Sequence, residues 1–266
     1  MAREEQPVTA LVRGLSILET FGRRGFSLTL AEVAQELGLP KSTVFRLLST
    51  LAGLGYVVQT VKGGAYTLGP AVLGLGHAVL DGLDLREAAQ PYLEALFQEV
   101  EGNVNLSLLE PGGLEVIYVA RLRKREVLSL NLNVGSRLPV HSSSPGRVLA
   151  AHLPSAERQA LLARVAADPQ AGAWLRERGV ELAEVLEQVR ADGYAVVDGE
   201  YMPELFALAA PVWDQDGRAV AAVSMAMVKH GENGQQLLER LRAPVLTCAA
   251  RVSALMGHPG QPGPAR

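Results

Sequence analysis

The sequence predicts an α+β protein with two domains: a winged helix-turn-helix, then a mixed domain built on one central antiparallel sheet. Three observations predict this organisation. Residues 27–56 have the pattern of two short amphipathic helices joined by a tight turn, and residues 56–68 that of a hairpin. Predicted strands and helices are mixed over residues 103–256. The chain has 266 residues, 48% of them hydrophobic, which is enough for two cores.

The first two helices are predicted from apolar spacing and from their ends. Apolar residues recur at helical intervals over residues 9–23 and again over residues 30–37. Thr29 stands where an N-cap hydroxyl accepts a backbone N–H. Gly38 is able to take the positive φ that ends a helix, and Pro40 begins a helix more readily than it continues one. A sharp turn is therefore expected between these two residues.

The third helix begins at Lys41, ends near Gly53 and presents basic and hydroxyl groups at its start. Its predicted buried stripe is Val44, Leu47, Leu48 and Leu51. The residues left on or near its outer faces are Lys41, Ser42, Thr43, Phe45, Arg46 and Thr50. Such a helix end suits the DNA major groove, since side chains reach base edges while backbone N–H groups and hydroxyls hold phosphates. The pattern predicts a DNA-binding helix.

A wing is predicted after this helix. Residues 56–59 alternate like a strand, Lys62-Gly-Gly is a hairpin turn signal, and residues 65–68 have the pattern of the returning strand. Lys62 at the wing tip would lie near a phosphate or the minor groove. Two amphipathic helices with a Gly-Leu-Pro turn also occur in helical domains that never meet DNA. The additional first helix and the hairpin favour the DNA-binding interpretation.

Charge and composition narrow the function classes. Residues 1–70 carry a net charge of +2 and residues 71–266 a net charge of −5, so the N-terminal part has the sign expected of a partner for phosphates. The single cysteine, Cys248, excludes an internal disulfide and fits a reducing cytoplasm. We find no signal-peptide pattern and no apolar run near the roughly 20 residues that cross a bilayer, so a soluble cytoplasmic protein with no membrane partner is expected.

Beyond the wing, the periodicity alternates between helices and strands. Helices are predicted over residues 70–83, 85–101, 146–151, 155–165, 181–192 and 234–256. Strands are predicted over residues 103–110, 115–121, 127–133, 194–198, 205–213 and 219–227. Hairpins at 103–121 and 205–227 make the sheet antiparallel. We expect a DNA-binding domain at 1–69, a linker helix at 70–83, a sensor-like domain at 84–257 and a disordered Gly- and Pro-rich tail at 258–266.

Several separate motifs carry a resemblance to a known family. They are Leu11-Val-Arg-Gly-Leu-Ser-Ile-Leu-Glu, Leu51-Ala-Gly-Leu-Gly-Tyr-Val, Tyr118-Val-Ala-Arg, Val134-Gly-Ser-Arg-Leu-Pro-Val-His, Ser144-Pro-Gly-Arg-Val-Leu-Ala-Ala, Val189-Arg-Ala-Asp-Gly-Tyr-Ala and Ala209-Ala-Pro-Val. Over nearly its whole length the chain resembles the IclR family of bacterial transcriptional regulators. Residues 127–139 are most similar to the branch that controls aromatic-acid catabolism through protocatechuate, p-hydroxybenzoate or β-ketoadipate.

The resemblance implies a winged helix-turn-helix, a linker helix and a GAF-like C-terminal domain that binds a small organic effector. It also implies dimers or tetramers on palindromic operators. The effector-binding residues that it implies are Ser143, Ser144, Pro145, Val197, Asp198, Leu205, Ala207, Ser224 and Ala226. The residues predicted to serve DNA binding are Thr29, Pro40, Lys41, Ser42, Thr43, Arg46, Thr50 and Lys62.

The chain departs from this family where relatives commonly have Gly-Leu-Arg-Ser or Gly-Leu-Arg-Cys, because here the residues are Glu204-Leu-Phe-Ala. Ala226 likewise replaces a frequent hydroxyl. A pocket lined by these residues is expected to have fewer anchors for a carboxylate, which weakens the expectation of an aromatic acid. Two alternatives stay open. One is a less polar effector; the other is an anion held by Arg121, Arg137, the hydroxyls of Ser142, Ser143 and Ser144, and the helix N-terminus at Gly146.

An enzyme is the weaker alternative. The five histidines are scattered and show no metal-ligand spacing, and no G-x-S-x-G motif is present. His141 is adjacent to Ser142 in sequence only, so a serine-dependent hydrolase lacks an oriented base. The sequence therefore predicts a regulator without catalytic residues, metal or cofactor. A stronger alternative is a ligand-sensing module whose N-terminal domain binds another protein.

Overall fold

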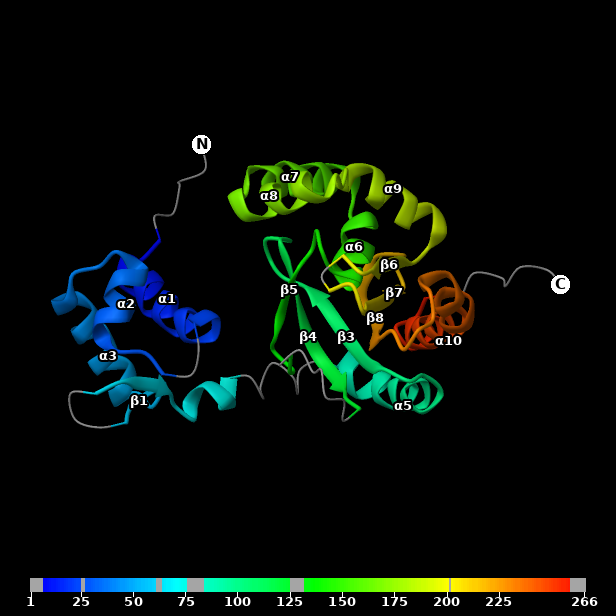
Figure 1. Ribbon diagram of the computed structural model, residues 1–266. Coiled ribbons are helices and arrows are strands. Elements are labelled where there is room, and N and C mark those ends of the chain that lie inside the picture. Colours follow the sequence, from blue (N-terminus) through cyan, green and yellow to red (C-terminus); the bar gives the residue numbers. More distant parts are fainter. Residues whose placement is uncertain are drawn as a thin grey trace. The chain divides into compact units, whose positions relative to one another are not determined.

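The computed structural model describes residues 7–24, 27–60, 64–75, 84–124, 132–200 and 202–258. The chain divides into two compact units, Met1–Gly82 and Leu83–Arg266, which are coloured blue to cyan and green to red in Figure 1. Within the described ranges, no helix combines the length and the apolar character needed to cross a membrane.

Within its described residues up to Leu68, the N-terminal unit has three helices and a two-stranded hairpin. Its elements are α1 (Thr9–Arg24), α2 (Leu30–Leu37), α3 (Lys41–Gly53), β1 (Val57–Gln59) and β2 (Tyr66–Leu68). The strands pair antiparallel with Val57 opposite Leu68. A small core joins these elements through Ile17, Phe21, Val33, Val44, Leu48 and Val57. This is the winged helix-turn-helix that the spacing predicts.

The turn between α2 and α3 follows from the residues that flank α2. Thr29 and Glu32 form a reciprocal capping box: the Thr29 hydroxyl accepts the N–H of Glu32 at 3.3 Å, and the Glu32 carboxylate accepts the N–H of Thr29 at 2.7 Å. Gly38 ends the helix in the left-handed region with a φ of 61°. Pro40 then precedes the first residue of α3. These local signals fix where α3 begins.

Part of the predicted linker lies outside the described residues. Residues 71–75 are helical, and residues 76–83 are among those not described. The same holds for Lys62, the predicted wing tip, and for residues 125–131, which cover most of the strand expected at 127–133. The described end of that segment, residues 132 and 133, is not in a strand.

The C-terminal unit is organised around one six-stranded antiparallel sheet with the strand order β5-β4-β3-β8-β7-β6. The strands are β3 (Asn103–Leu109), β4 (Glu115–Leu122), β5 (Arg137–Pro139), β6 (Ala195–Asp198), β7 (Leu205–Trp213) and β8 (Ala219–Val228). Both predicted hairpins are present, β3 with β4 and β7 with β8. The short edge strand β5 was not expected from the sequence; its three residues are too few to show an alternating pattern.

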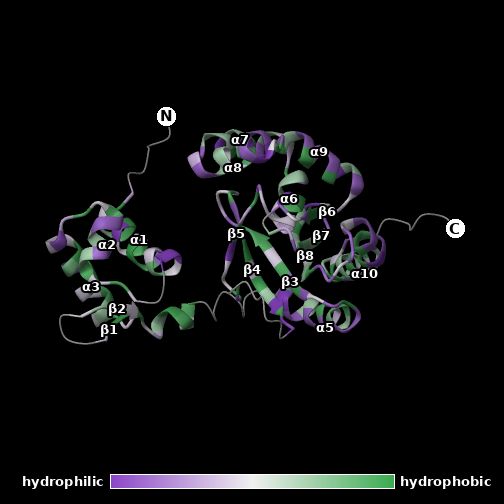
Figure 2. Ribbon diagram, in the orientation of Figure 1, coloured by the Kyte–Doolittle hydropathy of each residue, from purple (hydrophilic) through white to green (hydrophobic). Residues whose placement is uncertain are grey.

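Helices cover both faces of this sheet (Figure 1). α5 (Asp84–Glu99) and α10 (Gly234–Leu255) pack on one face, and α6 (Ser144–Ala151) packs on the other beside α9 (Leu182–Asp192). α7 (Ser155–Ala167) and α8 (Pro169–Arg178) follow α6 in the chain. In Figure 2, hydrophobic and hydrophilic residues are interleaved along α9 and α10, as expected for helices that bury one side.

Helix α8 is a second element that the sequence does not predict. It buries only Ala171 and Gly172, so it lacks the apolar stripe that periodicity detects. Its start is set by local chemistry instead: the Asp168 carboxylate accepts the N–H of Ala171 at 2.8 Å, and Pro169 occupies the first position.

The chain end differs slightly from expectation. His258, which was assigned to a disordered tail, donates its N–H to the Ser253 carbonyl at 3.0 Å. Its ring stacks on Trp213 with 6.1 Å between the ring centroids. The packed part of the C-terminal unit therefore includes His258, and residues 259–266 lie outside the description.

Candidate nucleic-acid interface and effector cavity

The core of the N-terminal unit decides which side of α3 faces outward. Val44 and Leu48 are fully buried, while Leu47 and Leu51 pack against the same core as half-buried side chains. The predicted stripe is therefore the inner side of the helix. Of the predicted outer residues, Lys41, Ser42, Phe45, Arg46 and Thr50 are exposed and Thr43 is half-buried. Pro40, just before the helix, is also exposed.

The outer side of α3 is cationic. The helix contains no acidic residue. Among the described residues, neither Lys41 nor Arg46 forms an ion pair with a carboxylate, whereas Arg24 of α1 is paired with Glu36 at 3.2 Å. Two exposed cations and a serine hydroxyl thus lie on one helix end with no competing anion on that helix.

Two predicted DNA-binding hydroxyls are already used within the unit. The Thr29 hydroxyl donates to the Glu32 carboxylate at 2.8 Å as part of the capping box. The Thr50 hydroxyl donates to the Arg46 carbonyl at 3.0 Å, one turn earlier in α3. We therefore assign Thr29 to capping of α2 and Thr50 to the helix backbone.

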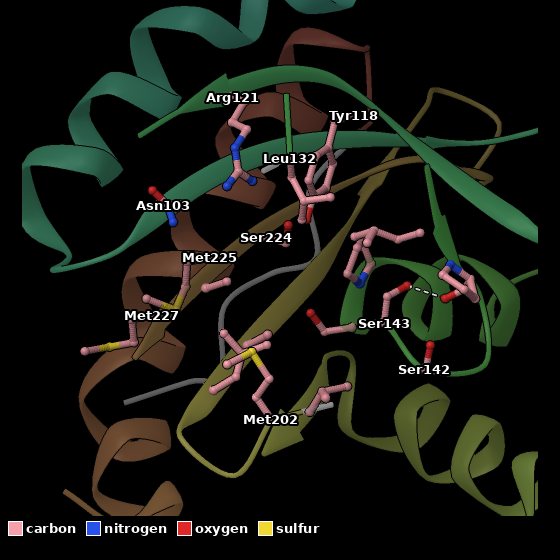
Figure 3. Close-up of a pocket in the computed structure, with 18 of the residues that line it drawn as sticks. Asn103, Tyr118, Arg121, Leu132, Ser142, Ser143, Met202, Ser224, Met225 and Met227 are labelled. Carbon is pink, nitrogen blue, oxygen red and sulfur yellow. Dashed lines mark hydrogen bonds between the residues drawn. The ribbon is translucent and has the colours of Figure 1, made fainter. Parts of the chain in front are cut away.

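The C-terminal unit contains a cavity of about 470 Å³ beside the first turn of α6 (Figure 3). Eight of the nine predicted effector residues line it: Ser143, Ser144, Pro145, Val197, Leu205, Ala207, Ser224 and Ala226. Figure 3 shows Arg121, Tyr118 and Ser224 reaching in from the strands, with Ser143 on another wall and Met202 contributed by the segment before β7.

Strand register explains why these residues converge. Val197 of β6 lies opposite Ala207 of β7, Ala207 lies opposite Ala226 of β8, and Ala226 lies opposite Asn103 of β3. A single row across four strands thus forms one wall. Because successive side chains of a strand point to opposite faces, Asp198 and Phe206, which adjoin Val197 and Ala207, are absent from the cavity lining.

This alternation corrects two expectations. Asp198 follows Val197 and does not line the cavity; it forms an ion pair with Lys229 at 2.6 Å. Phe206 lies between Leu205 and Ala207, is fully buried and is also absent from the cavity wall. Phenylalanine in place of the family's arginine therefore removes no cation from this cavity. The loss of polar groups is confined to Ala207 and Ala226, which do line it.

Arg121 supplies the positive charge at the polar end. Its Nη1 donates to the Asn105 Oδ1 at 2.7 Å, and the amide of Asn105 lies 3.5 Å from the Ser224 hydroxyl. The Arg121 Nε is buried and has no hydrogen-bond partner among the described residues. Burial lowers the pKa of Arg121, and the neighbouring Tyr118 opposes that change. A guanidinium remains charged at neutral pH, so the cavity contains a cation with unused hydrogen-bonding capacity.

Tyr118 is the partner of Arg121 that sequence reasoning missed. The guanidinium lies over its ring, 5.3 Å from the centroid. Burial raises the pKa of Tyr118 to about 12, against the opposing effect of the Arg121 charge, so the phenol is neutral at physiological pH. Both residues belong to the Tyr-Val-Ala-Arg motif, and this motif was the available signal. The remaining missed lining residues include Asn103, Leu132, Leu138, Met202 and Glu204.

The other predicted anion ligands are not equivalent. Arg137 lines the cavity, but its Nε is paired with Glu110 at 2.6 Å. The Gly146 N–H is capped by the Ser143 hydroxyl at 3.3 Å, and this hydroxyl donates to the Pro139 carbonyl at 2.7 Å. The Ser144 hydroxyl, by contrast, is buried without a partner among the described residues. Among the described residues, Arg121 and Ser144 thus have buried polar atoms without partners, and the half-buried Ser142 also lines the cavity.

A buried ion pair supports the cavity wall from behind. Arg147 of α6 is 2% exposed and donates both Nη groups to the Glu200 carboxylate, at 2.7 and 2.6 Å. Its Nε donates to the His141 carbonyl at 2.9 Å. The Arg147 guanidinium thus connects α6 to Glu200, which follows β6, and to the backbone of His141.

Comparison with known proteins agrees with this arrangement. Residues 10–60 match the IclR helix-turn-helix domain, and residues 77–254 match the family described as bacterial transcriptional regulator IclR C-terminal. The Pca regulon regulatory protein of Pseudomonas putida is 34% identical over 254 residues, which cover 92% of this chain and 82% of that protein. Transcriptional repressor IclR of Escherichia coli (strain K12) is 32% identical over 219 residues, covering 82% of this chain and 80% of the repressor.

Solved structures show the same fold. An IclR family transcriptional regulator from Brucella abortus has a TM-score of 0.79 at 27% identity, covering 95% of this chain and 94% of that one. An IclR homolog complexed with 4-hydroxybenzoate from Microbacterium hydrocarbonoxydans has a TM-score of 0.71 at 26% identity, covering 94% and 99%. The chain belongs to the IclR family of bacterial transcriptional regulators, and it is a regulator with a helix-turn-helix domain and an effector-binding domain rather than an enzyme.

Proposed function

We propose that this protein binds a palindromic operator as a dimer or tetramer and that a small organic acid, bound in the C-terminal cavity, changes its occupancy of DNA. The observation that carries the proposal is the buried Nε of Arg121, a residue that lines the cavity; this cationic donor has no hydrogen-bond partner among the described residues. The same chain carries a helix-turn-helix domain whose α3 presents exposed cations.

The proposed DNA contacts are Lys41, Ser42, Thr43 and Arg46. Their positions within the first two turns of α3 fit a recognition helix, in which residues near the N-terminus contact base edges. Lys41 and Arg46 supply the charge for phosphates, and backbone N–H groups at the start of α3 add hydrogen-bond donors. Lys62 stays a predicted contact, since it lies outside the described residues.

Pairing of two copies is supported by an apolar stripe formed by α1 and the residue just before it. Val8, Leu11, Val12 and Leu15 are spaced at i, i+3, i+4 and i+7 and are 68%, 62%, 48% and 52% exposed. A contiguous apolar stripe exposed to water is unfavourable unless another surface covers it. A second copy related by a twofold axis would cover it and would place two recognition helices on the two halves of a palindrome.

The effector class follows from the two ends of the cavity. A carboxylate would accept hydrogen bonds from the Arg121 guanidinium and from the Ser144 hydroxyl. An apolar body, such as an aromatic ring, would pack against Val197, Leu205 and Ala207. One similar structure, the Microbacterium homolog, is complexed with 4-hydroxybenzoate, and one relative is the Pca regulon regulatory protein. Aromatic acids are therefore the first class to test.

The test combines DNA selection with ligand addition, using the full-length protein. Duplexes enriched from a random pool are expected to contain inverted half-sites separated by about one helical turn, 10–10.5 base pairs, or a multiple of it. Adding benzoate, 4-hydroxybenzoate or protocatechuate is expected to change the affinity for the selected duplex, and the corresponding neutral amides are not. Failure to enrich any duplex would contradict the DNA half of the proposal; an affinity unchanged by every acid would contradict the effector half.

A further inference from the structure

Phe45 is the only large apolar side chain that the described residues of α3 expose to solvent. It is 54% exposed, whereas the preceding Val44 is fully buried. No aromatic or cation–π contact involves Phe45 among the described residues. The ring therefore lies on the outer side of the helix without a stacking partner.

The surroundings of Phe45 along α3 are polar. Lys41 and Ser42 precede it by four and three residues, and Ser49 follows it by four, so these side chains share its side of the helix. All three are exposed. A lone aromatic ring among cationic and hydroxyl groups does not form an apolar patch of the kind that covers a protein partner. It is instead an apolar group placed within the surface proposed to enter the major groove.

We propose that Phe45 is a specificity-determining residue whose ring packs against the C5-methyl group of thymine in the operator. This inference rests on the DNA contacts of α3 proposed above. Among the groups that base pairs display in the major groove, the thymine methyl is the apolar one; the others are hydrogen-bond donors and acceptors. An exposed aromatic ring entering that groove thus has one complementary chemical group, and Lys41, Ser42 and Arg46 take the polar ones.

The decisive experiment removes only the methyl group. Duplexes are first selected from a random pool with the full-length protein, and each thymine of a half-site is then replaced singly by deoxyuridine. For the wild-type protein, one deoxyuridine position per half-site is expected to weaken binding about fourfold, the loss that corresponds to one buried methyl-sized group. For Phe45→Ala, the thymine and deoxyuridine duplexes are expected to bind equally.

Leu54→Ala is the matched control. Leu54 is the C-cap residue that follows α3 and is 62% exposed, so this variant removes an exposed apolar side chain beyond the far end of the helix. It is expected to retain the fourfold discrimination at the same thymine. Thermal unfolding of both variants checks that the domain is intact. We expect both to fold, because each substitution truncates an exposed side chain.

The outcomes separate this inference from the function on which it rests. If no duplex is enriched, the proposed DNA binding itself is wrong. If a duplex is enriched and no deoxyuridine weakens wild-type binding, the thymine contact is wrong while DNA binding stands. The same conclusion follows if deoxyuridine weakens the wild type and Phe45→Ala equally.

Discussion

The guanidinium of Arg121 lies over the ring of Tyr118, 5.3 Å from its centroid, although the two residues are three positions apart on one strand. In a regular strand that spacing puts two side chains on opposite faces. Here Asn105 lies opposite Arg121 while Ser107, two residues later, lies opposite Tyr118, because the register shifts between Leu106 and Ser107. The bulge brings the cation and the phenol to the same end of the cavity.

The first prediction concerns the cations of α3. Lys41→Ala is expected to weaken DNA binding and to reduce the slope of log affinity against log salt by roughly 0.9, the value for one lost phosphate contact. Arg46→Ala is expected to do the same if it contacts a phosphate, and to relax sequence preference if it contacts a base. Arg24→Ala, which removes the arginine paired with Glu36, is the control and should leave the slope unchanged. Slopes unchanged in both α3 variants would exclude the proposed groove contact.

The second prediction concerns the apolar stripe of α1. Leu11→Asp places a charge in the middle of that stripe and is expected to separate the copies. The average molar mass of the protein in solution, measured by light scattering or sedimentation, should therefore fall. Val58→Asp is the control, because Val58 is 45% exposed on β1, outside the stripe. Should Leu11→Asp keep the wild-type mass at every concentration, α1 would not hold the copies together.

The third prediction concerns the ion pair behind the cavity wall. Glu200→Ala leaves the Arg147 guanidinium, whose side chain is 3% exposed, without its carboxylate. Loss of one partner of a buried pair destabilises by 3–5 kcal/mol, and we expect about 3 kcal/mol because the Glu200 side chain is 25% exposed. Asp198→Ala breaks the more exposed pair with Lys229 and should lower the free energy of unfolding by less than about 1 kcal/mol. The free energy of unfolding is measured by urea unfolding. Equal decreases in the two variants would contradict the larger contribution of the Arg147–Glu200 pair.

The fourth prediction is a pH dependence. His152 is partly buried, and its ring meets Trp213 edge-on with 4.7 Å between centroids. Burial lowers the pKa of His152 from its ordinary 6.5. The folded state therefore favours the neutral ring, so its contribution to stability is complete above pH 6.5 and is lost as the pH falls below that value. Burial and the nearby charge of Arg147 also lower the pKa of His141.

The measurement is the free energy of unfolding at pH 7.5 and at pH 5. His152→Gln is expected to lose less stability between these two values than the wild type does. His230 is exposed, so His230→Gln serves as the control and should follow the wild-type curve. An identical pH dependence for wild type and His152→Gln would show that this ring does not titrate as the fold implies.

The sequence predicted the helix-turn-helix closely because its limits are set by local chemistry. The capping hydroxyl of Thr29 and the left-handed Gly38 define the first and last residues of α2, which apolar periodicity alone does not define. The strands β7 and β8 could also be predicted, because a polar turn separates two long apolar runs in the sequence. Helix α8 has no such apolar signal, and its start is marked only by the Asp168 cap and Pro169.

The candidate cavity was predicted in part. Eight of its residues followed from the family resemblance, but Asp198 was misplaced because the face of a strand residue depends on register. The same dependence explains why Phe206, which was expected to cost the pocket a carboxylate anchor, does not line the cavity. Tyr118 could not be placed beside Arg121 from spacing, since a bulge shifts the register by one residue without a distinct sequence pattern.

Binding of an organic acid at Arg121 is tested most directly by the thermal shift of full-length protein with benzoate, 4-hydroxybenzoate, protocatechuate and small dicarboxylic acids. We predict that at least one acid raises the melting temperature of the wild type. Arg121→Met is expected to weaken that acid's binding by about tenfold or more, since it removes hydrogen bonds to a charged group, while Arg137→Met, which alters the cavity-lining arginine already paired with Glu110, retains it. A stabilising acid that binds Arg121→Met as tightly as the wild type, or the absence of any stabilising acid, would contradict the account.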